Sequence, residues 1–217
     1  MKRGIIGCGI IRKDIQEMVD QLPYEAEICW LDEDLHSYPA KLHDEIQKKI
    51  DEMSECEEIV LTYLLCGNAL VGIGSDTSRV RFIKGDDCIY AELCSLPEYK
   101  ELRSRSFFLS HGWLNTRRNS IEDYRQTVEK YGEKRARRIY DALYRNYRNV
   151  IYMRMNGETP EEDQRKVEEF AAITKLEPRY VDGSLELYRK LLYLEEDERI
   201  TVLQPGERVS ERMFRNL

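Results

Sequence analysis

Apolar runs rich in β-branched residues alternate along this chain with segments in which apolar positions recur at helical spacing. Such alternation is typical of βα units that build a parallel sheet. The strongest strand signal is residues 58–65 (EIVLTYLL), which are apolar almost throughout, as expected of a central strand covered on both faces. The clearest amphipathic helix is predicted over residues 39–53. Its apolar stripe consists of Leu42, Ile46, Ile50 and Met53.

The same patterns predict the rest of the elements. Further strands are expected at residues 3–8, 26–30, 80–83, 88–93, 106–109, 149–155, 179–181 and 200–203. Further helices are expected at residues 12–21, at 120–148 with a break near Gly132, from 159 onward and at 184–194. The chain has no repeat and no long linker rich in Gly, Pro or Ser. We therefore expect one α/β domain over residues 1–217, with a three-layer, mostly parallel, Rossmann-like sheet flanked by helices.

Composition and charge limit the partners and the cellular location that are expected. The chain has 34 Lys and Arg against 41 Asp and Glu, which gives a net charge of −7 and argues against nucleic-acid or anionic-membrane binding. No apolar run approaches the roughly 18 residues of a spanning helix, and the N-terminus lacks the apolar core of a secretory signal. We expect a cytoplasmic protein without a membrane segment. The oligomeric state stays open.

Six cysteines lie in the first half of the chain, without a CxxC pair or zinc-finger spacing. In parallel α/β sheets, ligands bind beyond the carboxyl ends of the strands. Cys8 and Cys66 each follow a predicted strand, and Cys88 joins them if the loop 85–87 turns back over that edge. The other three lie within or beside predicted strands and helices and are interpreted as core residues: Cys29, Cys56 and Cys94.

Three thiolates at one edge suit zinc, or iron in a cluster. His36 and His111 are candidates for a fourth position, whereas His43 lies on a charged helix and is expected to be solvated. Gly67 and Asn68, directly after Cys66, would let a ligand approach the backbone. The alternative is that all these cysteines are small buried residues.

A second alternative is nucleotide binding. Gly7 and Gly9 flank Cys8 in a turn that resembles the start of a dinucleotide fingerprint, but Arg12 stands where the third glycine belongs. Asp32, after the second strand, has the place of a ribose-binding carboxylate. In this interpretation the two glycines contact the cofactor and the cysteines are structural.

A series of short motifs also identifies a family. In order, they are LD at 31–32, LH at 35–36, LTYLLCGNALVG at 61–72, DCI at 87–89, FFLSHGW at 107–113, YGE at 131–133, DGS at 182–184 and QPG at 204–206. The set resembles the uncharacterised family known as domain of unknown function 1638. Its members are found mostly in methanogens and other anaerobes, often beside corrinoid-dependent methyltransferase systems.

The resemblance implies a role near one-carbon or methyl-transfer metabolism, but no established reaction. It covers nearly the whole chain. The family usually has His-Asp-Cys where this chain has Asp86-Asp87-Cys88, so the ligand set here shifts toward an oxygen donor or stays with the thiolates. The matching positions are Cys8, His36, Cys66, Gly67, Asn68, Asp87 and Cys88.

Three hypotheses follow. The first is a metal-binding protein, an enzyme or not, in anaerobic methyl-transfer or corrinoid metabolism, with Cys8, Cys66, Cys88 and His36 as metal ligands. Its partner would be a small molecule or a protein of a corrinoid system. The second is a metallochaperone or accessory partner without catalysis. The third is a nucleotide-binding α/β protein with structural cysteines.

Overall fold

The computed structural model describes residues 2–155 and 157–214, which form two compact units. Unit 1 comprises residues 2–92 and 184–214, and unit 2 comprises residues 93–155 and 157–183. The predicted α/β class with mostly parallel strands is confirmed, although the strands divide between two sheets. The single-domain organisation stays a prediction, because compactness does not decide whether the units fold independently.

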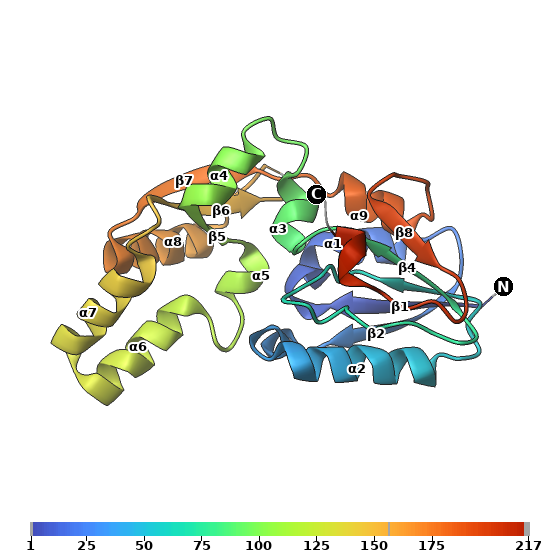
Figure 1. Cartoon of the computed structure of the whole chain (residues 1–217). Helices are drawn as coiled ribbons and strands as arrows, with labels where there is room; N and C mark the ends of the chain where they lie inside the picture. The colour runs from blue at the N-terminus through green and yellow to red at the C-terminus, as the bar shows by residue number, and fades with distance from the viewer. Residues whose placement is uncertain (1, 156, 215–217) are drawn as a thin grey trace. The chain divides into compact units, whose positions relative to one another are not determined.

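Unit 1 contains a five-stranded sheet in the order β2-β1-β3-β4-β8 (Figure 1). The first four of these strands are parallel, and β8 pairs antiparallel with β4 at the edge. The bounds are β1 (Arg3–Cys8), β2 (Ala26–Leu31), β3 (Glu58–Leu61), β4 (Arg79–Ile83) and β8 (Ile200–Leu203). The chain crosses from β1 to β2 and then back to β3 on the other side of β1, so strand order reverses between β1 and β3.

Helices connect the strands of unit 1. The reversal in strand order places α1 and α2 on opposite faces, because parallel crossovers are right-handed. All four residues of the predicted stripe are buried, three of them on α2 and Met53 at its C-cap, which confirms the helical period. The bounds are α1 (Arg12–Asp20), α2 (Pro39–Glu52), α3 (Cys88–Leu93) and α9 (Glu186–Leu192), with 3₁₀ helices η1 (Gly9–Ile11), η2 (Glu33–Ser37) and η3 (Glu211–Phe214).

Unit 2 contains a three-stranded parallel sheet in the order β5-β6-β7. Its core is formed where α8 packs on this sheet, around residues such as Val150, Val167 and Phe170. The predicted helix break at Gly132 is confirmed, since this residue has φ +77 between α6 and α7. The bounds are β5 (Ser106–Leu109), β6 (Asn149–Arg154), β7 (Glu177–Asp182), α4 (Tyr99–Arg105), α5 (His111–Leu114), α6 (Ser120–Tyr131), α7 (Glu133–Tyr144) and α8 (Glu161–Thr174).

One predicted strand is wrong. Residues 88–93 form helix α3, because the Asp87 carboxylate accepts a hydrogen bond from the backbone N–H of Tyr90 at 3.2 Å and so caps the first turn. A short apolar run fits either a buried strand or a buried helix, and here the capping residue decides. Among the described residues, no helix has the length and apolar character needed to cross a membrane.

Candidate functional site

Four loops of unit 1 bring the predicted ligands to one edge of its sheet. Cys8 ends β1, His36 lies in η2 directly after β2, and Cys66 follows β3. Cys88 begins α3, after the loop that follows β4. Because these four strands are parallel, their carboxyl ends share an edge, and Cys8 and Cys66 flank the reversal in strand order where α/β proteins bind ligands.

Backbone hydrogen bonds fix these loops. The N–H of Cys8 donates to Thr62 Oγ1 at 2.9 Å, which joins the ends of β1 and β3. The N–H groups of Leu65 and Cys66 donate at 2.9 and 2.8 Å to the carbonyl oxygens of Gly85 and Asp86. The loop 85–87 therefore turns back beside Cys66. This is the condition under which Cys88 was predicted to join Cys8 and Cys66.

The backbone of residues 66–68 is strained. Cys66, Gly67 and Asn68 have φ of 45°, 68° and 71°, so three successive residues adopt the left-handed conformation. This conformation costs a residue with a side chain roughly 1–2 kcal/mol. Such strain concentrates at functional sites. Gly67 and Asn68 are exposed, whereas Cys66 is half-buried, so the segment lies between the buried thiols and solvent.

His36 contacts the first thiol directly. Its Nε2 atom lies 3.6 Å from Cys8 Sγ, and its ring stacks on that of Tyr63 with centroids 5.8 Å apart. Burial lowers the pKa of His36, which favours the neutral imidazole that binds metals. The structure therefore brings His36 into contact with one of the three predicted thiol ligands, Cys8.

The environment keeps the three thiols protonated. Burial raises the pKa of Cys8 to about 12, and burial also raises the pKa of Cys66 and of Cys88. Negative charge on Asp87 raises the pKa of the last two further, as does that on Glu92 for Cys88. Cys8 and Cys66 also contribute to the raised pKa of Cys88.

Two buried polar side chains of this unit were not predicted from the sequence. Glu92 is 2% exposed and Tyr188 is fully buried. Among the residues that the structure describes, Glu92 Oε2 and the Tyr188 hydroxyl find no hydrogen-bond partner. Burial, with the charges of Asp14 and Asp87, raises the pKa of Glu92 well above its ordinary value. A lone acid in an otherwise apolar run (CIYAELC) was the available signal for Glu92.

The two glycines predicted to bind a cofactor have packing reasons of their own. A Cβ atom on Gly7 would lie 2.3 Å from the Trp30 ring, and one on Gly9 would lie 2.7 Å from the Leu31 carbonyl oxygen. The Asp32 carboxylate accepts a hydrogen bond from the Asp34 N–H at 2.8 Å and caps η2. Nucleotide binding stays a prediction, but these residues are explained without it.

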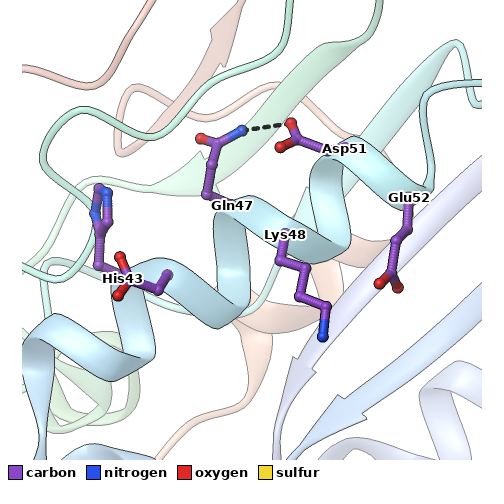
Figure 2. Close-up of a pocket in the computed structure, with 6 residues that line it drawn as sticks. His43, Gln47, Lys48, Asp51 and Glu52 are labelled. Carbon is purple, nitrogen blue, oxygen red and sulfur yellow. Dashed lines mark hydrogen bonds between the residues drawn. The ribbon is translucent and has the colours of Figure 1, made fainter.

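The remaining cysteines and His43 have the following surroundings. Cys56 is buried as predicted, whereas Cys29 and Cys94 are half-buried. His43 was expected to be solvated, but its Nδ1 atom donates to the Ala69 carbonyl oxygen at 3.0 Å. Figure 2 shows a surface pocket along α2 that His43 and Gln47 line, where Gln47 donates to Asp51 at 2.8 Å. This pocket is open and its polar groups are solvated or paired locally.

His111 lies in unit 2, where Asp163 orients it. The Nδ1 atom of His111 donates to Asp163 Oδ2 at 2.8 Å, and the Tyr152 hydroxyl donates to the same oxygen at 2.6 Å. Asn115 donates to Asp163 Oδ1 at 3.2 Å. Burial opposes ionisation of Asp163, but these three hydrogen bonds outweigh it and hold its pKa below the ordinary value.

A metal site requires its donor side chains to point toward a common position, and not only to lie at the same edge of the sheet. Within residues 2–155 and 157–214, no three His, Cys, Asp or Glu side chains are arranged so as to hold a metal ion. The donor types at the edge suit zinc or iron, since they comprise thiols, an imidazole and a carboxyl group. Metal binding would therefore require the protonated side chains to lose protons and to rotate toward a common point.

Comparison with known proteins gives a family and no activity. Neither the functionally curated proteins nor the solved structures include a significant match. The family model for "Protein of unknown function (DUF1638)" matches residues 30–192, which include His36, Cys66 and Cys88 but not Cys8. Since the match spans most of the chain, this protein belongs to the DUF1638 family.

Proposed function

We propose that this protein binds a soft or borderline metal ion, zinc or iron, through Cys8, Cys66 and Cys88, with His36 completing or flanking the ligand set. The observation on which this rests is the convergence of four loops, each following a parallel strand, on the edge where strand order reverses. Thiolate and imidazole ligands are the set that zinc and iron prefer.

The raised pKa values favour a metal over a reactive thiol. A nucleophilic cysteine needs a lowered pKa, provided by a nearby cation or a helix N-terminus. At this edge, burial raises the pKa of each thiol, and acidic groups raise two of them further. A bound cation reverses this balance, because coordination to a metal deprotonates a thiol outright.

Each residue has a role in this proposal. The thiolates of Cys8, Cys66 and Cys88 would hold the metal, and neutral His36 would supply a nitrogen ligand. Exposed Asn68 and the backbone at Gly67 would orient a molecule that approaches from solvent. When bound, zinc would supply Lewis-acid chemistry and lower the pKa of a coordinated thiol or water.

The wider role is inferred from the family. The resemblance supports a place in anaerobic methyl-transfer or corrinoid metabolism, with a small molecule or a corrinoid-system protein as partner, in the cytoplasm. An enzyme and a metallochaperone both fit the proposed site. They differ in whether the metal stays bound while a methyl acceptor is converted or passes to a partner that lacks it.

Elemental analysis of protein purified without oxygen tests the proposal. We expect about one metal per chain in the wild type, and loss of it in Cys8→Ser, Cys66→Ser and Cys88→Ser. Cys56→Ser is the matched control, because Cys56 is a buried cysteine of the same unit that is 1% exposed. Circular dichroism verifies that each variant folds. A wild type without bound metal after reconstitution with zinc and with iron(II), or equal metal loss in the control, would refute the proposal.

A further inference from the structure

A surface pocket lies where α6 and α7 of unit 2 join (Figure 1). Its volume is 890 Å³, within the range of roughly 300–1,000 Å³ that is typical of pockets for small molecules. Three residues that line it are cationic, namely Lys134, Arg135 and Arg138, and two are apolar, namely Ile139 and Ala142. Since these residues follow one another at spacings of three and four, they lie on one side of α7.

The cations of this pocket are not balanced by carboxylates. Among the residues that the structure describes, the side chains of Lys134, Arg135 and Arg138 take part in no salt bridge. Arg137 on the same helix shows the contrast, since its Nε atom lies 2.7 Å from Glu133 Oε1. This pair also neutralises Glu133, which lines the pocket. The pocket is therefore locally positive in a protein whose net charge is −7.

Tyr131 adds an exposed aromatic ring to the pocket. Its side chain is 42% exposed, and the Arg135 guanidinium lies 5.1 Å from the centroid of its ring. A guanidinium held over a ring retains its N–H donors for an anion. Gly132, which precedes α7, provides no capping side chain, so the helix dipole adds to the positive potential.

We propose that this pocket binds a phosphorylated small molecule that has a planar or apolar body. Lys134, Arg135 and Arg138 would donate hydrogen bonds to its phosphate oxygens, because the arginine fork matches phosphate geometry. The body of the molecule would contact Tyr131 and Ile139. The inference does not depend on a metal in unit 1.

Charge complementarity selects this ligand. Three cations without carboxylate partners match the several negative charges of a diphosphate better than the single charge of a carboxylate. A nucleic acid is a poorer match, because its regularly spaced phosphates require a longer row of cations and because the net charge of −7 repels it.

Calorimetric titration with ADP and with inorganic pyrophosphate tests the pocket. Both probes have a diphosphate, but only ADP has a planar base, so we expect ADP to bind more tightly. In Arg138→Gln the affinity for ADP should fall about 10-fold, since a hydrogen bond to a charged group is lost. Arg145→Gln is the matched control, because Arg145 is exposed at the C-terminal end of the same helix and does not line the pocket. Circular dichroism verifies that each variant folds.

Amide chemical shifts locate the bound probe. ADP should shift the resonances of residues 132–138, whereas shifts at Gly7 and Gly9 instead would place the nucleotide in unit 1 and overturn the proposal. No binding of either probe at millimolar concentrations, or equal losses of affinity in Arg138→Gln and Arg145→Gln, would also overturn it. Pyrophosphate binding as tight as that of ADP would refute the contact of a ligand body with Tyr131. If Arg138→Gln does not fold, Lys134→Gln gives the same readouts.

Discussion

Two buried carboxyl groups, Glu92 in unit 1 and Asp163 in unit 2, have opposite surroundings. Asp163 accepts hydrogen bonds from Tyr152, His111 and Asn115, and its pKa lies below the ordinary value. Glu92 has an oxygen without a hydrogen-bond partner among the described residues, and its pKa lies well above the ordinary value. Asp163 has its hydrogen-bond donors within its own unit, whereas the Oε2 atom of Glu92 has none among the described residues.

The difference separates a satisfied hydrogen-bond network from a buried group with an unsatisfied oxygen. A buried carboxylate whose partners all belong to the chain stabilises the fold and orients its neighbours, here the imidazole of His111. A buried carboxyl group that lacks such partners destabilises the fold unless something else binds it. The proposed metal binding by Cys88, one helical turn before Glu92, would change the surroundings of this group.

Removing the carboxyl group should be costly in unit 2 and harmless in unit 1. Asp163→Ala leaves three donors without their acceptor, so we expect the free energy of unfolding to fall by about 3 kcal/mol. In the metal-free protein, Glu92→Gln should be neutral or stabilising, because it removes no hydrogen bond of Oε2. Urea unfolding measures both. A loss of similar size in the two variants would show that the carboxyl groups have the same role.

Metal should stabilise unit 1 and leave unit 2 unchanged. At a free zinc concentration 100-fold above the dissociation constant, binding should add about 2.7 kcal/mol to the stability of the wild type. Cys66→Ser should abolish this gain, whereas Asp163→Asn should lower the starting stability and retain the gain. Thermal unfolding with and without zinc measures it. A gain that Cys66→Ser retains would place the metal elsewhere.

The two carboxyl groups should also give the free energy of unfolding pH dependences of opposite sign. The pKa of Asp163 is lowered in the folded protein, so its contribution is complete above the ordinary value of 3.8 and is lost as the pH falls through the folded-state pKa. The pKa of Glu92 is raised, so its contribution is complete below the ordinary value of 4.5 and is lost as the pH rises toward the folded-state pKa.

Unfolding curves of metal-free protein from pH 3 to pH 8 reveal these slopes, each at most about 1.4 kcal/mol per pH unit. In the wild type, stability should rise between pH 3 and pH 4 through Asp163, and this rise should be absent from Asp163→Asn. Stability should fall above pH 4.5 through Glu92, and this fall should be absent from Glu92→Gln. Slopes of the same sign for both groups would contradict the comparison.

The smallest effect concerns backbone strain. Asn68 in unit 1 and Lys175 in unit 2 have φ of 71° and 61°, and glycine adopts this conformation without steric cost. Asn68→Gly and Lys175→Gly should each raise stability by up to about 1 kcal/mol. Only Asn68→Gly should also alter zinc affinity, measured by titration. Equal zinc affinity in both variants would limit Asn68 to a backbone role.

Much of the candidate site follows from the sequence, because strands and their ends leave local signals. The run that ends before Cys66 and the turn at Gly67 place a thiol after a buried strand. Glu92 was missed because its run of residues was read as a strand, and the Asp87 cap that makes this run a helix is a local contact that periodicity does not record. The hydrogen bond between His111 and Asp163 was also not predictable from the sequence, since the two residues lie 52 positions apart.

By itself, the sequence determines the alternation of strands and helices, the stripe that α2 buries and the strand ends that bear Cys8 and Cys66. These features depend on the residues next to one another along the chain, whose spacing shows which face of each element is buried. Only the tertiary structure decides that the strands form two sheets, that the loop after β4 returns toward Cys66, and which buried carboxyl group is satisfied. Hydrogen bonds and burial join residues far apart in the chain, and the local pattern does not specify those partners.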